Sequence, residues 1–350
     1  MVDIDKDNLP NIIDGNVPKN YELCKEGDIV FADASEDTNE VAKAVEYYNL
    51  NGKKVVCGLH TIHGRDNKNK TVVGYKGYAF SSMSFHHQIR RIAQGTKIYS
   101  INSKNFSECY VGIPSKDEQQ KIADLLRLID ERIATQNKII EDLKKLKSAI
   151  IENVFDNKHS ERLQLDNVGS YIRGLTYSSN DVVEHGGTLV MRSNNIVNGS
   201  LLDYNNNVVF VNKQMSAEQQ LQNGDVVICM ANGSSSLVGK SSFYDGSCHS
   251  PITVGAFCGI YRSKEPIVKW LFQTNKYRRY IWNSLQGGNG AIANLNGEDI
   301  LNMSFSIPNA PIKDTCVKML TSVDSALENN MSLCALYTLQ KQHLLRLMFI

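Results

Sequence analysis

Two long stretches of the chain carry apolar residues at the spacing of a helical seam. In the first stretch they recur at intervals of three and four, or at sums of these, which is the 3.5-residue period of a coiled coil; they are Ile122, Leu126, Ile129, Ile133, Ile140, Leu143, Ile150 and Val154. Only Gln136 and Lys147 interrupt the seam. We expect one helix from Ser115 to Phe155, about 60 Å long, which suits a spacer better than a core helix.

The start of this helix has a sequence signal of its own. Ser115 follows Pro114 and precedes Glu118 by three residues. The Ser115 side chain can accept a hydrogen bond from the backbone N–H of Glu118 while the Glu118 carboxylate reaches back. This capping box predicts that the helix begins at Ser115.

The same seam recurs at the end of the chain. A shift of 194 residues carries the first stretch onto residues 309–349, where Gln136 becomes Asn330 and Lys147 becomes Lys341. The seam positions there are Cys316, Leu320, Val323, Leu327, Asn330, Cys334, Tyr337, Lys341, Leu344 and Met348. Two unrelated helices would seldom agree at so many positions, so the pattern predicts a duplication.

Strand and turn patterns precede each long helix. In the first half, Ile29–Phe31 and Lys53–Leu59 are expected strands, and Phe80–Ala93 is an expected helix that ends near Gly95, where glycine can take the left-handed cap conformation. The second half repeats the Gly-Asp turn that precedes the first of these strands, at Gly224 and Asp225. Each repeat is therefore predicted to be a strand-rich region followed by a long helix.

The repeat is incomplete at its beginning. A shift of 197 residues carries Lys43 onto Lys240, and it places Met1 opposite Asn198. Residues 156–197 then have no counterpart in the first repeat. We expect the first globular region to be shortened at its N-terminus, as a shortened gene product, as a rearranged variant whose halves are exchanged between gene copies, or through the choice of fragment.

Composition excludes several classes of protein. The 350 residues suffice for two domains, no run approaches eighteen apolar residues, and the first ten residues are acidic and polar. We therefore expect a cytoplasmic protein without a membrane span or secretory signal. The eight cysteines form no C-x-x-C pair, which suits reduced core thiols better than disulfides or zinc, so no metal site is expected.

Charge is distributed unevenly although the net charge is only +1. Residues 1–50 hold twelve Asp and Glu against four Lys, whereas residues 51–110 hold ten Lys and Arg against two acids. The asymmetry could place a basic face on an anionic partner, or the two stretches could neutralise each other within one domain.

The sequence contains no complete catalytic motif. Residues 233–241 resemble a phosphate-binding P-loop, but five residues instead of four separate the glycines and the following residues are turn-like rather than helical. A methyltransferase would need a glycine-rich cofactor turn and an Asn-Pro-Pro or Asp-Pro-Pro tetrapeptide, and neither is present. A nuclease would need clustered carboxylates near a lysine. Glu141 and Asp142, beside Lys144, are expected to form a solvated helix face rather than such a site. We expect no catalytic residue and no cofactor.

Polar, glycine-containing loops are the remaining candidates for function. The segments 94–100 and 286–292 and the loops 33–43 and 232–240 combine short polar side chains, free backbone N–H groups and lysines, which suit contacts to phosphates and base edges. Any one of them alone would read as an ordinary surface turn. Their recurrence in both repeats favours a shared use.

The residues around the first long helix resemble a known family. Residues Ile113 to Asp124, the following Leu128 to Ile133, and the Gly-Asp-Ile-Val and Gln-Gly-Thr-Lys segments look like the specificity subunit of type I restriction-modification enzymes. The resemblance extends over nearly the whole chain.

The resemblance implies an α+β fold with two tandem strand-rich target-recognition domains, each followed by a long helix, as a pseudo-twofold internal repeat. The expected domains are a shortened recognition domain 1–114, a helix 115–155, a recognition domain 156–308 and a helix 309–350. The helices are expected to pack as an antiparallel coiled coil. Implied partners are double-stranded DNA, two modification subunits that bind S-adenosylmethionine and methylate adenine, and restriction subunits; the chain itself would be non-catalytic.

Site residues are carried over from the resemblance at matching positions. Those expected to contact DNA are Lys43, Gly95, Thr96, Lys97, Tyr99, Arg173, Thr176, Tyr177, Asn232, Ser234, Lys240, Gly287 and Asn289. Those expected to bind partner subunits are Glu118, Gln119, Ile122 and Arg132. The second helix lacks the Glu-Gln pair of the first. The alternatives are a coiled-coil scaffold or silent variant that has lost DNA reading and, third, a self-contained methylating or cleaving enzyme.

Overall fold

The computed structural model describes residues 1–12, 21–155, 160–285 and 293–349. The chain divides into two compact units. Unit 1 comprises Met1–Ile139 and Asn330–Ile350, and unit 2 comprises Ile140–Asn329. Each unit holds part of both long helices, and each is considered by itself.

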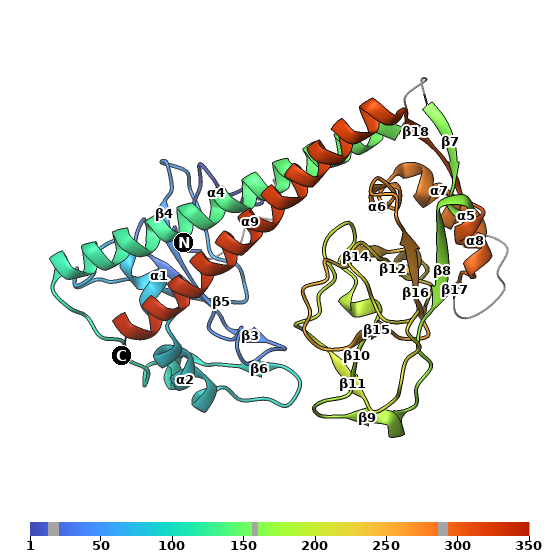
Figure 1. Ribbon diagram of the computed structural model, residues 1–350. Helices are drawn as coiled ribbons and strands as arrows, with labels where there is room; N and C mark the ends of the chain where they lie inside the picture. Colours follow the sequence, from blue (N-terminus) through green and yellow to red (C-terminus); the bar gives the residue numbers. More distant parts are fainter. Residues whose placement is uncertain (13–20, 156–159, 286–292, 350) are drawn as a thin grey trace. The chain divides into compact units, whose positions relative to one another are not determined.

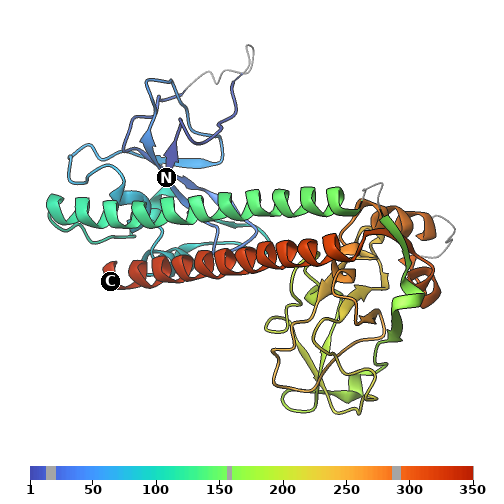
Figure 2. The same ribbon diagram turned by 45° about the horizontal axis from the view of Figure 1, so that its top comes forward.

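The long helices are α4, Lys116–Phe155, and α9, Ala310–Met348, which lie side by side in both views (Figure 1, Figure 2). All seam positions are buried or half-buried, as the apolar period predicts. At the start of α4, the Ser115 hydroxyl accepts from the N–H of Glu118 at 3.3 Å, which is the Ser115 half of the predicted capping box.

The polar residues that interrupt the seam have partners within it. Gln136 donates a hydrogen bond to Asn330 in unit 1. In unit 2, Lys147 Nζ lies 2.6 Å from Asp324 Oδ1. The interruptions are therefore matched polar pairs rather than gaps in the packing.

Matching contacts join each strand-rich region to the helices of its own unit. In unit 1 the Tyr78 hydroxyl donates to Asp130, which also pairs with Lys341. In unit 2 the Trp270 indole donates to Asp324 at 3.0 Å. The two aspartates are equivalent in the sequence repeat, so the repeat extends to side-chain contacts.

The sheet of unit 1 has the order β1-β4-β2-β5, with β2 antiparallel to both neighbours and β1 parallel to β4. Its strands are β1 Val2–Asp3, β2 Ile29–Ala32, β4 Ala44–Asn49 and β5 Thr61–Gly64; β3 Ala34–Ser35 pairs separately with β6 Tyr99–Ser100. The short helices are α1 Tyr75–Ala79, α2 Met83–Ile92 and α3 Ser103–Phe106. Phe31, Phe85 and Ile89 form the core between sheet and helices.

Two expectations for unit 1 are corrected. Residues 53–59 form only an isolated bridge at Val56, because Val55 and Cys57 pack in a small cluster with Tyr47 instead of along a neighbouring strand. The expected helix 80–93 corresponds to α2 alone, which begins three residues later than expected, at Met83; α1 lies before it. The start is set by Ser82, whose hydroxyl caps α2 by accepting from the N–H of Phe85.

Unit 2 contains the corresponding sheet in the order β14-β12-β16-β8 and a second sheet in the order β15-β10-β11-β9. The first is built from β8 Gly169–Arg173, β12 Val226–Cys229, β14 Ser241–Phe243 and β16 Cys258–Ser263, and the second from β9 Val182–Val183, β10 Thr188–Met191, β11 Val209–Val211 and β15 Ile252–Val254. Strands β8, β9 and β10 come from the segment that the sequence repeat leaves unmatched. Of these strands, β10 adds Leu189 and Met191 to a core cluster that contains residues of both sheets, and β8 adds the half-buried Ile172.

Shorter elements complete unit 2. Two strand pairs join β7 Ser160–Gln164 to β18 Ser304–Pro308 and β13 Ala231–Asn232 to β17 Ala293–Asn294. The helices are α5 Leu165–Val168, α6 Val268–Leu271, α7 Asn275–Leu285 and α8 Gly297–Leu301, with 3₁₀ turns η1 Ser179–Asp181, η2 Ser193–Asn195 and η3 Ser235–Leu237. Among the described residues, no helix is long and apolar enough to cross a membrane.

A buried aspartate anchors the Gly-Asp turn of both units. Asp28 is bound by the Arg65 guanidinium at 2.9 and 2.6 Å, and Asp225 by that of Arg262 at 2.8 and 2.7 Å. Burial by itself would raise the pKa of Asp28, but the hydrogen bonds from Arg65, from the N–H of Lys25 and from His63, with the charge of Arg65, together outweigh it and lower the pKa to about 2. The aspartate is conserved between the repeats because it holds the turn.

Candidate nucleic-acid interface

Short strand pairs bring together the loop segments that the sequence singled out. In unit 1, β3 and β6 pair so that Ser35 lies opposite Tyr99, which joins the loop 33–43 to the segment 94–100. In unit 2, β13 and β17 pair so that Asn232 lies opposite Ala293. The same two parts of each repeat therefore meet in each unit.

The unit 1 surface is a polar loop beside the end of α2. Lys97 and Thr96 are exposed, and Tyr99 is half-buried. Lys43 is exposed but pairs with Glu40 at 2.6 Å, so part of its charge is neutralised within the loop. Arg90, from the last turn of α2, donates to Asn39 in the same loop at 3.3 Å.

Gly95 has a structural reason to be glycine. Its φ is +142°, and a Cβ atom at this position would lie 1.9 Å from the carbonyl oxygen of Ile98. No side chain fits there without moving the backbone. Gly95 shapes the loop that carries Lys97, whatever the loop contacts.

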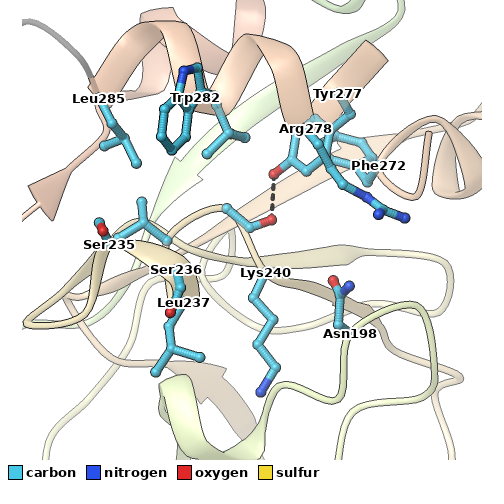
Figure 3. A pocket seen from close by; sticks show the side chains of 13 residues that line it. Asn198, Ser235, Ser236, Leu237, Lys240, Phe272, Tyr277, Arg278, Trp282 and Leu285 are labelled. Atoms are coloured by element: carbon cyan, nitrogen blue, oxygen red, sulfur yellow. Dashed lines mark hydrogen bonds between the residues drawn. The ribbon is translucent and has the colours of Figure 1, made fainter. Parts of the chain in front are cut away.

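In unit 2 the loop 232–240 and helix α7 enclose a pocket of about 440 Å³ (Figure 3). Its floor is residues 235–240, and α7 supplies Tyr277, Arg278, Ile281, Trp282 and Leu285; Asn198 and Phe272 complete the lining. The Tyr277 hydroxyl donates to the carbonyl of Gly239 at 2.8 Å, which fixes the floor to the helix. Burial raises the pKa of Tyr277, so this hydroxyl stays protonated at neutral pH.

The pocket combines positive charge with an exposed aromatic ring. Within the described part of the chain, neither Lys240 nor Arg278 forms an ion pair with an acidic side chain. The Trp282 side chain is 67% exposed although tryptophan is normally buried. Free cations beside an exposed ring and serine hydroxyls can bind phosphates and the flat faces of bases or sugars.

The stretch 173–177 lies at the same end of the sheet as the pocket loop. Arg173, at the end of β8, pairs with Gly259 in β16, and its side chain is exposed. Two residues before Gly259, the carbonyl of Phe257 accepts from the N–H groups of Met230 and Ala231, where the pocket loop begins. Thr176 is exposed and Tyr177 half-buried. The structure therefore brings this stretch toward the loop, as the site prediction requires.

Several candidate side chains hold the loop itself. Asn232 Nδ2 donates to the Ser193 hydroxyl at 3.3 Å, and its Oδ1 accepts from the N–H of Ser234 at 3.0 Å. The Ser234 hydroxyl lies 2.8 Å from that of Ser236. Asn232 is thus engaged in loop structure, whereas Ser234 stays exposed. Gly287 and Asn289 lie outside the described residues.

The P-loop alternative fails on secondary structure. Lys240 leads directly into β14, Ser241–Phe243, whose residues are buried in the sheet. A strand provides no helix N-terminus for a phosphate.

The four residues expected to bind partner subunits differ in their exposure. Glu118 and Arg132 are exposed on α4. Ile122 is half-buried and packs with Leu126 against α1. Gln119 is 0% exposed. Its Oε1 accepts from the N–H of Val72 at 3.0 Å, and its Nε2 donates to the carbonyls of Lys70 and Pro114 at 3.0 and 2.8 Å, so it ties the helix start to unit 1.

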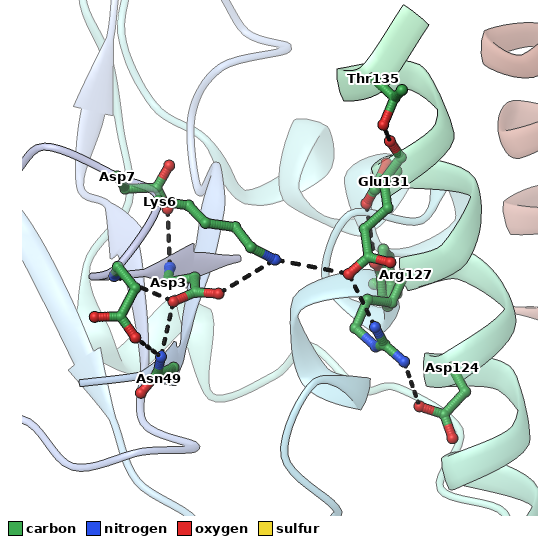
Figure 4. Close-up of polar contacts among 11 residues, drawn as sticks. Asp3, Lys6, Asp7, Asn49, Asp124, Arg127, Glu131 and Thr135 are labelled. Carbon is green, nitrogen blue, oxygen red and sulfur yellow. Dashed lines mark hydrogen bonds and ion pairs between the residues drawn. The ribbon is translucent and has the colours of Figure 1, made fainter. Parts of the chain in front are cut away.

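Another face of α4 is occupied by the N-terminal segment of unit 1 (Figure 4). Lys6 Nζ lies 3.4 Å from Asp3 in β1 and 3.6 Å from Glu131 in α4. Arg127 donates to the same Glu131 at 2.9 Å. This face is already engaged in contacts within the unit.

Sequence reasoning missed the residues of α7. Trp282, Arg278 and Asn198 line the pocket, yet none was singled out. A signal was present: Tyr277 and Ile281 are buried at helical spacing, and Trp282 and Arg278 fall on the polar face of the same helix. A tryptophan on a polar helix face indicates a binding surface.

The two units thus define an α+β protein with long helices, in which a pair of polar loop segments recurs in each unit. Residues 7–145 match the family described as type I restriction modification DNA specificity domain. This match confirms the resemblance that the motifs in residues 113–133 indicated.

Individual relatives agree with the family match. The specificity subunit of the type I restriction enzyme EcoKI from Escherichia coli (strain K12) is 34% identical over 155 residues, which are 41% of this chain and 31% of that protein. The StySPI specificity subunit from Salmonella potsdam is 33% identical over 153 residues, again 41% and 31%. The chain thus spans about a third of the length of the curated relatives it matches.

Two solved structures are similar in fold. The crystal structure of a type I restriction-modification S subunit from M. genitalium aligns with a TM-score of 0.59 and 15% identity, covering 93% of this chain and 83% of that one. A chain from a study of complex assembly and conformational transition of the type I system aligns with a TM-score of 0.52 and 14% identity, covering 95% and 84%. At these identities the likeness concerns the fold alone.

Proposed function

We propose that the chain is a non-catalytic specificity subunit that reads a bipartite DNA target for a type I restriction-modification complex. Residues 1–114 and 156–308 would be the two target-recognition domains, and residues 115–155 and 309–350 the helices that separate them. The chemistry would belong to the modification and restriction subunits that dock on this chain.

The observation that carries the proposal is the repeated loop pair. The loops 33–43 and 232–240 each start at a short strand. In unit 1 this strand pairs with β6, at the end of the segment 94–100, and in unit 2 it pairs with β17, directly after the segment 286–292. Two copies of one polar surface on one chain fit a protein that reads two half-sites of DNA. The match of residues 7–145 to the specificity-domain family supports the same reading.

Contacts between the helices support an antiparallel coiled coil. Asp130 contacts Lys341 and Gln136 contacts Asn330 in unit 1, and Lys147 contacts Asp324 in unit 2. As the residue number rises along α4, the number of its partner in α9 falls. A paired rod is stiffer than one helix, so its length would set the gap between the half-sites.

In unit 2 the pocket beside α7 is the proposed DNA-facing surface. Lys240 and Arg278 would neutralise phosphates, and Trp282 would pack against sugar or base. Arg173 would add a further cation from the end of β8. In unit 1, Lys97 and the loop ending at Lys43 would take the equivalent role, with Arg90 beside them.

The helices also carry a surface suited to partner helices. Leu125, Leu128 and Ile139 on α4, and Leu333, Leu336 and Leu339 on α9, are each at least 40% exposed in unit 1. On α4 they are three and eleven residues apart, and on α9 they are three residues apart, which keeps each set on a restricted face outside the buried seam. Exposed apolar rows on long helices favour docking of further helices, which we assign to the modification subunits; Glu118 and Arg132 lie on the same exposed helix.

The test is co-purification with a candidate modification subunit, followed by sequencing of methylated adenines in cells that express both. A split methylated motif with two defined halves is the expected result. A single defined half would restrict DNA reading to one unit. A complex without DNA binding or methylation would favour the scaffold, and S-adenosylmethionine bound to the isolated chain would favour an enzyme.

A further inference from the structure

Three side chains with metal-binding atoms meet in unit 1 although the sequence separates them. The Sγ atoms of Cys24 and Cys57 lie 3.2 Å apart, and one ring nitrogen of His63 lies within 4.8 Å of both. Cys24 is buried, and the other two are half-buried. Two thiols and an imidazole are the ligand types that zinc prefers. Spacing did not predict the group because 33 residues separate the two cysteines.

Unit 2 carries apolar core residues at the three equivalent positions. The shift of 197 residues that aligns Asp28 with Asp225 carries the group onto Leu221, Val254 and Ile260. These three side chains are at most 5% exposed and belong to one core cluster. Three equivalent positions therefore form an apolar contact in unit 2 and carry three possible metal ligands in unit 1.

The backbone supports this correspondence. The N–H of Cys24 donates to the carbonyl of Val55, and the N–H of Leu221 donates to that of Ile252, each at 2.9 Å. In the sheets, His63 lies opposite Val30, as Ile260 lies opposite Val227. The three positions are therefore equivalent in hydrogen bonding and register as well as in sequence. At all three positions a metal-binding side chain of unit 1 corresponds to an apolar side chain of unit 2.

The orientation of His63 suits a ligand. Its Nε2 lies 2.9 Å from Oδ2 of Asp28. The Arg65 guanidinium donates to both oxygens of Asp28, so this carboxylate acts as an acceptor and the Nε2 atom of His63 carries the hydrogen. The lone pair of Nδ1 is then free. A carboxylate that fixes the imidazole in this way is the common outer partner of a metal-bound histidine.

A carboxylate oxygen, a possible fourth ligand atom, lies close to Nδ1 of His63. Glu22 Oε2 lies 3.8 Å from Nδ1 of His63, which is too long for a hydrogen bond but suits two ligands of one ion. The sulfur atoms would separate from 3.2 Å to about 3.8 Å to fit a tetrahedral zinc ion. Small side-chain rotations achieve this shift.

We propose that Cys24, Cys57 and His63 bind a divalent zinc-class ion in unit 1, with Asp28 as the residue that positions His63. The ion joins the segment before β2 to the segment before β5 and to β5 itself. It replaces the apolar contact by which unit 2 holds the same three segments together. A disulfide between the two cysteines would leave the convergence of His63 unused.

The first test is the metal content of the full chain, purified in reductant and dialysed against metal-free buffer after loading with zinc. One zinc ion per chain is expected by elemental mass spectrometry. The variants Cys57→Ser and His63→Asn should each lose most of the bound zinc. Cys109→Ser is the matched control, because Cys109 is also half-buried in unit 1 but lies outside the group, and it should retain the ion.

Cobalt gives an independent readout. Co²⁺ added to the apo chain should produce thiolate charge-transfer absorption and the visible bands of tetrahedral coordination, both absent in Cys57→Ser. The triple variant Cys24→Leu, Cys57→Val, His63→Ile carries the residues of unit 2. It should keep the circular dichroism of the wild type and bind no ion, which separates loss of ligands from loss of fold.

Three results would overturn the proposal. The first is the absence of bound zinc and of cobalt–thiolate absorption in a chain whose eight cysteine thiols all titrate as reduced. The second is a Cys24–Cys57 disulfide, found by peptide mapping of reductant-purified chain that takes up no metal. The third is undiminished binding by the triple variant.

Discussion

Lys147 Nζ lies 2.6 Å from Asp324 Oδ1, and both side chains are 7% exposed. Each residue would be costly to bury alone, but together they complete the helix seam of unit 2. Lys147 also donates to the carbonyl of Gly199 at 2.7 Å, and Asp324 accepts from the Trp270 indole. The pair thus connects both helices to the strand-rich part of the unit.

Replacing Lys147 by Met should destabilise unit 2 by about 3 kcal/mol, because the buried Asp324 loses its partner at 2.6 Å and retains only the more distant Lys269 at 3.7 Å among the described residues. Urea unfolding followed by tryptophan fluorescence measures this, since both tryptophans, Trp270 and Trp282, lie in unit 2. Lys145→Met is the control. Lys145 pairs with Glu141 on the exposed face, and its loss should leave the midpoint unchanged.

A double variant tests whether the unpaired charge of Asp324 causes the loss of stability. Lys147→Met combined with Asp324→Leu removes both charges and should recover much of the lost stability. Recovery will be incomplete, because Asp324 also accepts from Trp270 and lies 3.7 Å from Lys269. A double variant less stable than Lys147→Met would contradict the view that the unpaired charge causes the loss.

Gln119→Ala should loosen the start of α4 in unit 1. The change leaves the N–H of Val72 and two carbonyls without partners at a buried site, with an expected cost of about 2–3 kcal/mol. Hydrogen exchange of residues 70–80 and 112–120 should accelerate. The exposed neighbour Gln120, replaced by Ala, should leave exchange unchanged, and equal protection in both variants would disprove the structural role of Gln119.

Gly239→Ala should distort the pocket of unit 2. Gly239 has a φ of +80°, and a Cβ atom there would lie 2.7 Å from Ile281 Cγ1. The expected destabilisation is about 1–3 kcal/mol, from backbone strain and overpacking. Gly233→Ala is the matched control in the same loop, because its Cβ would meet no atom within 4 Å. Denaturant midpoints compare the two directly.

Lys240→Gln and Arg278→Gln should each weaken DNA binding by the complex of this chain with its modification subunit. If each cation neutralises one phosphate, the slope of log K against log salt should become shallower by about 0.9 per variant. Lys318→Gln, an exposed change on α9, is the control. An unchanged slope in both pocket variants would indicate that DNA binds to a different surface of the chain.

Leu128→Glu should reduce binding of the modification subunit while leaving the chain folded. Leu128 is 52% exposed, so the charge costs little in the isolated chain, but it would be buried in the proposed partner contact. Pull-down with the modification subunit measures the effect, expected to be at least tenfold in affinity. Lys138→Glu, exposed on the same helix, should bind as the wild type, and retention of binding by Leu128→Glu would place the partner on another face.

The sequence by itself determined the long helices, the repeat and the Gly-Asp strands. These features depend on periodicity and on short-range signals such as the Ser115 cap, which a single chain displays directly. It also identified the candidate loops and the motif of the specificity subunit, since both consist of contiguous residues. It misjudged residues 53–59, where packing around Tyr47 prevails over strand propensity.

Only the tertiary structure decided which distant residues meet. It gave partners to Gln136 and Lys147, it placed Trp282 and Arg278 beside Lys240, and it buried Gln119. It also brought Cys24 and Cys57 together with His63 across three separate segments. The physical reason is common to all of these cases: side-chain contacts between elements depend on strand register and helix packing, which local periodicity does not encode.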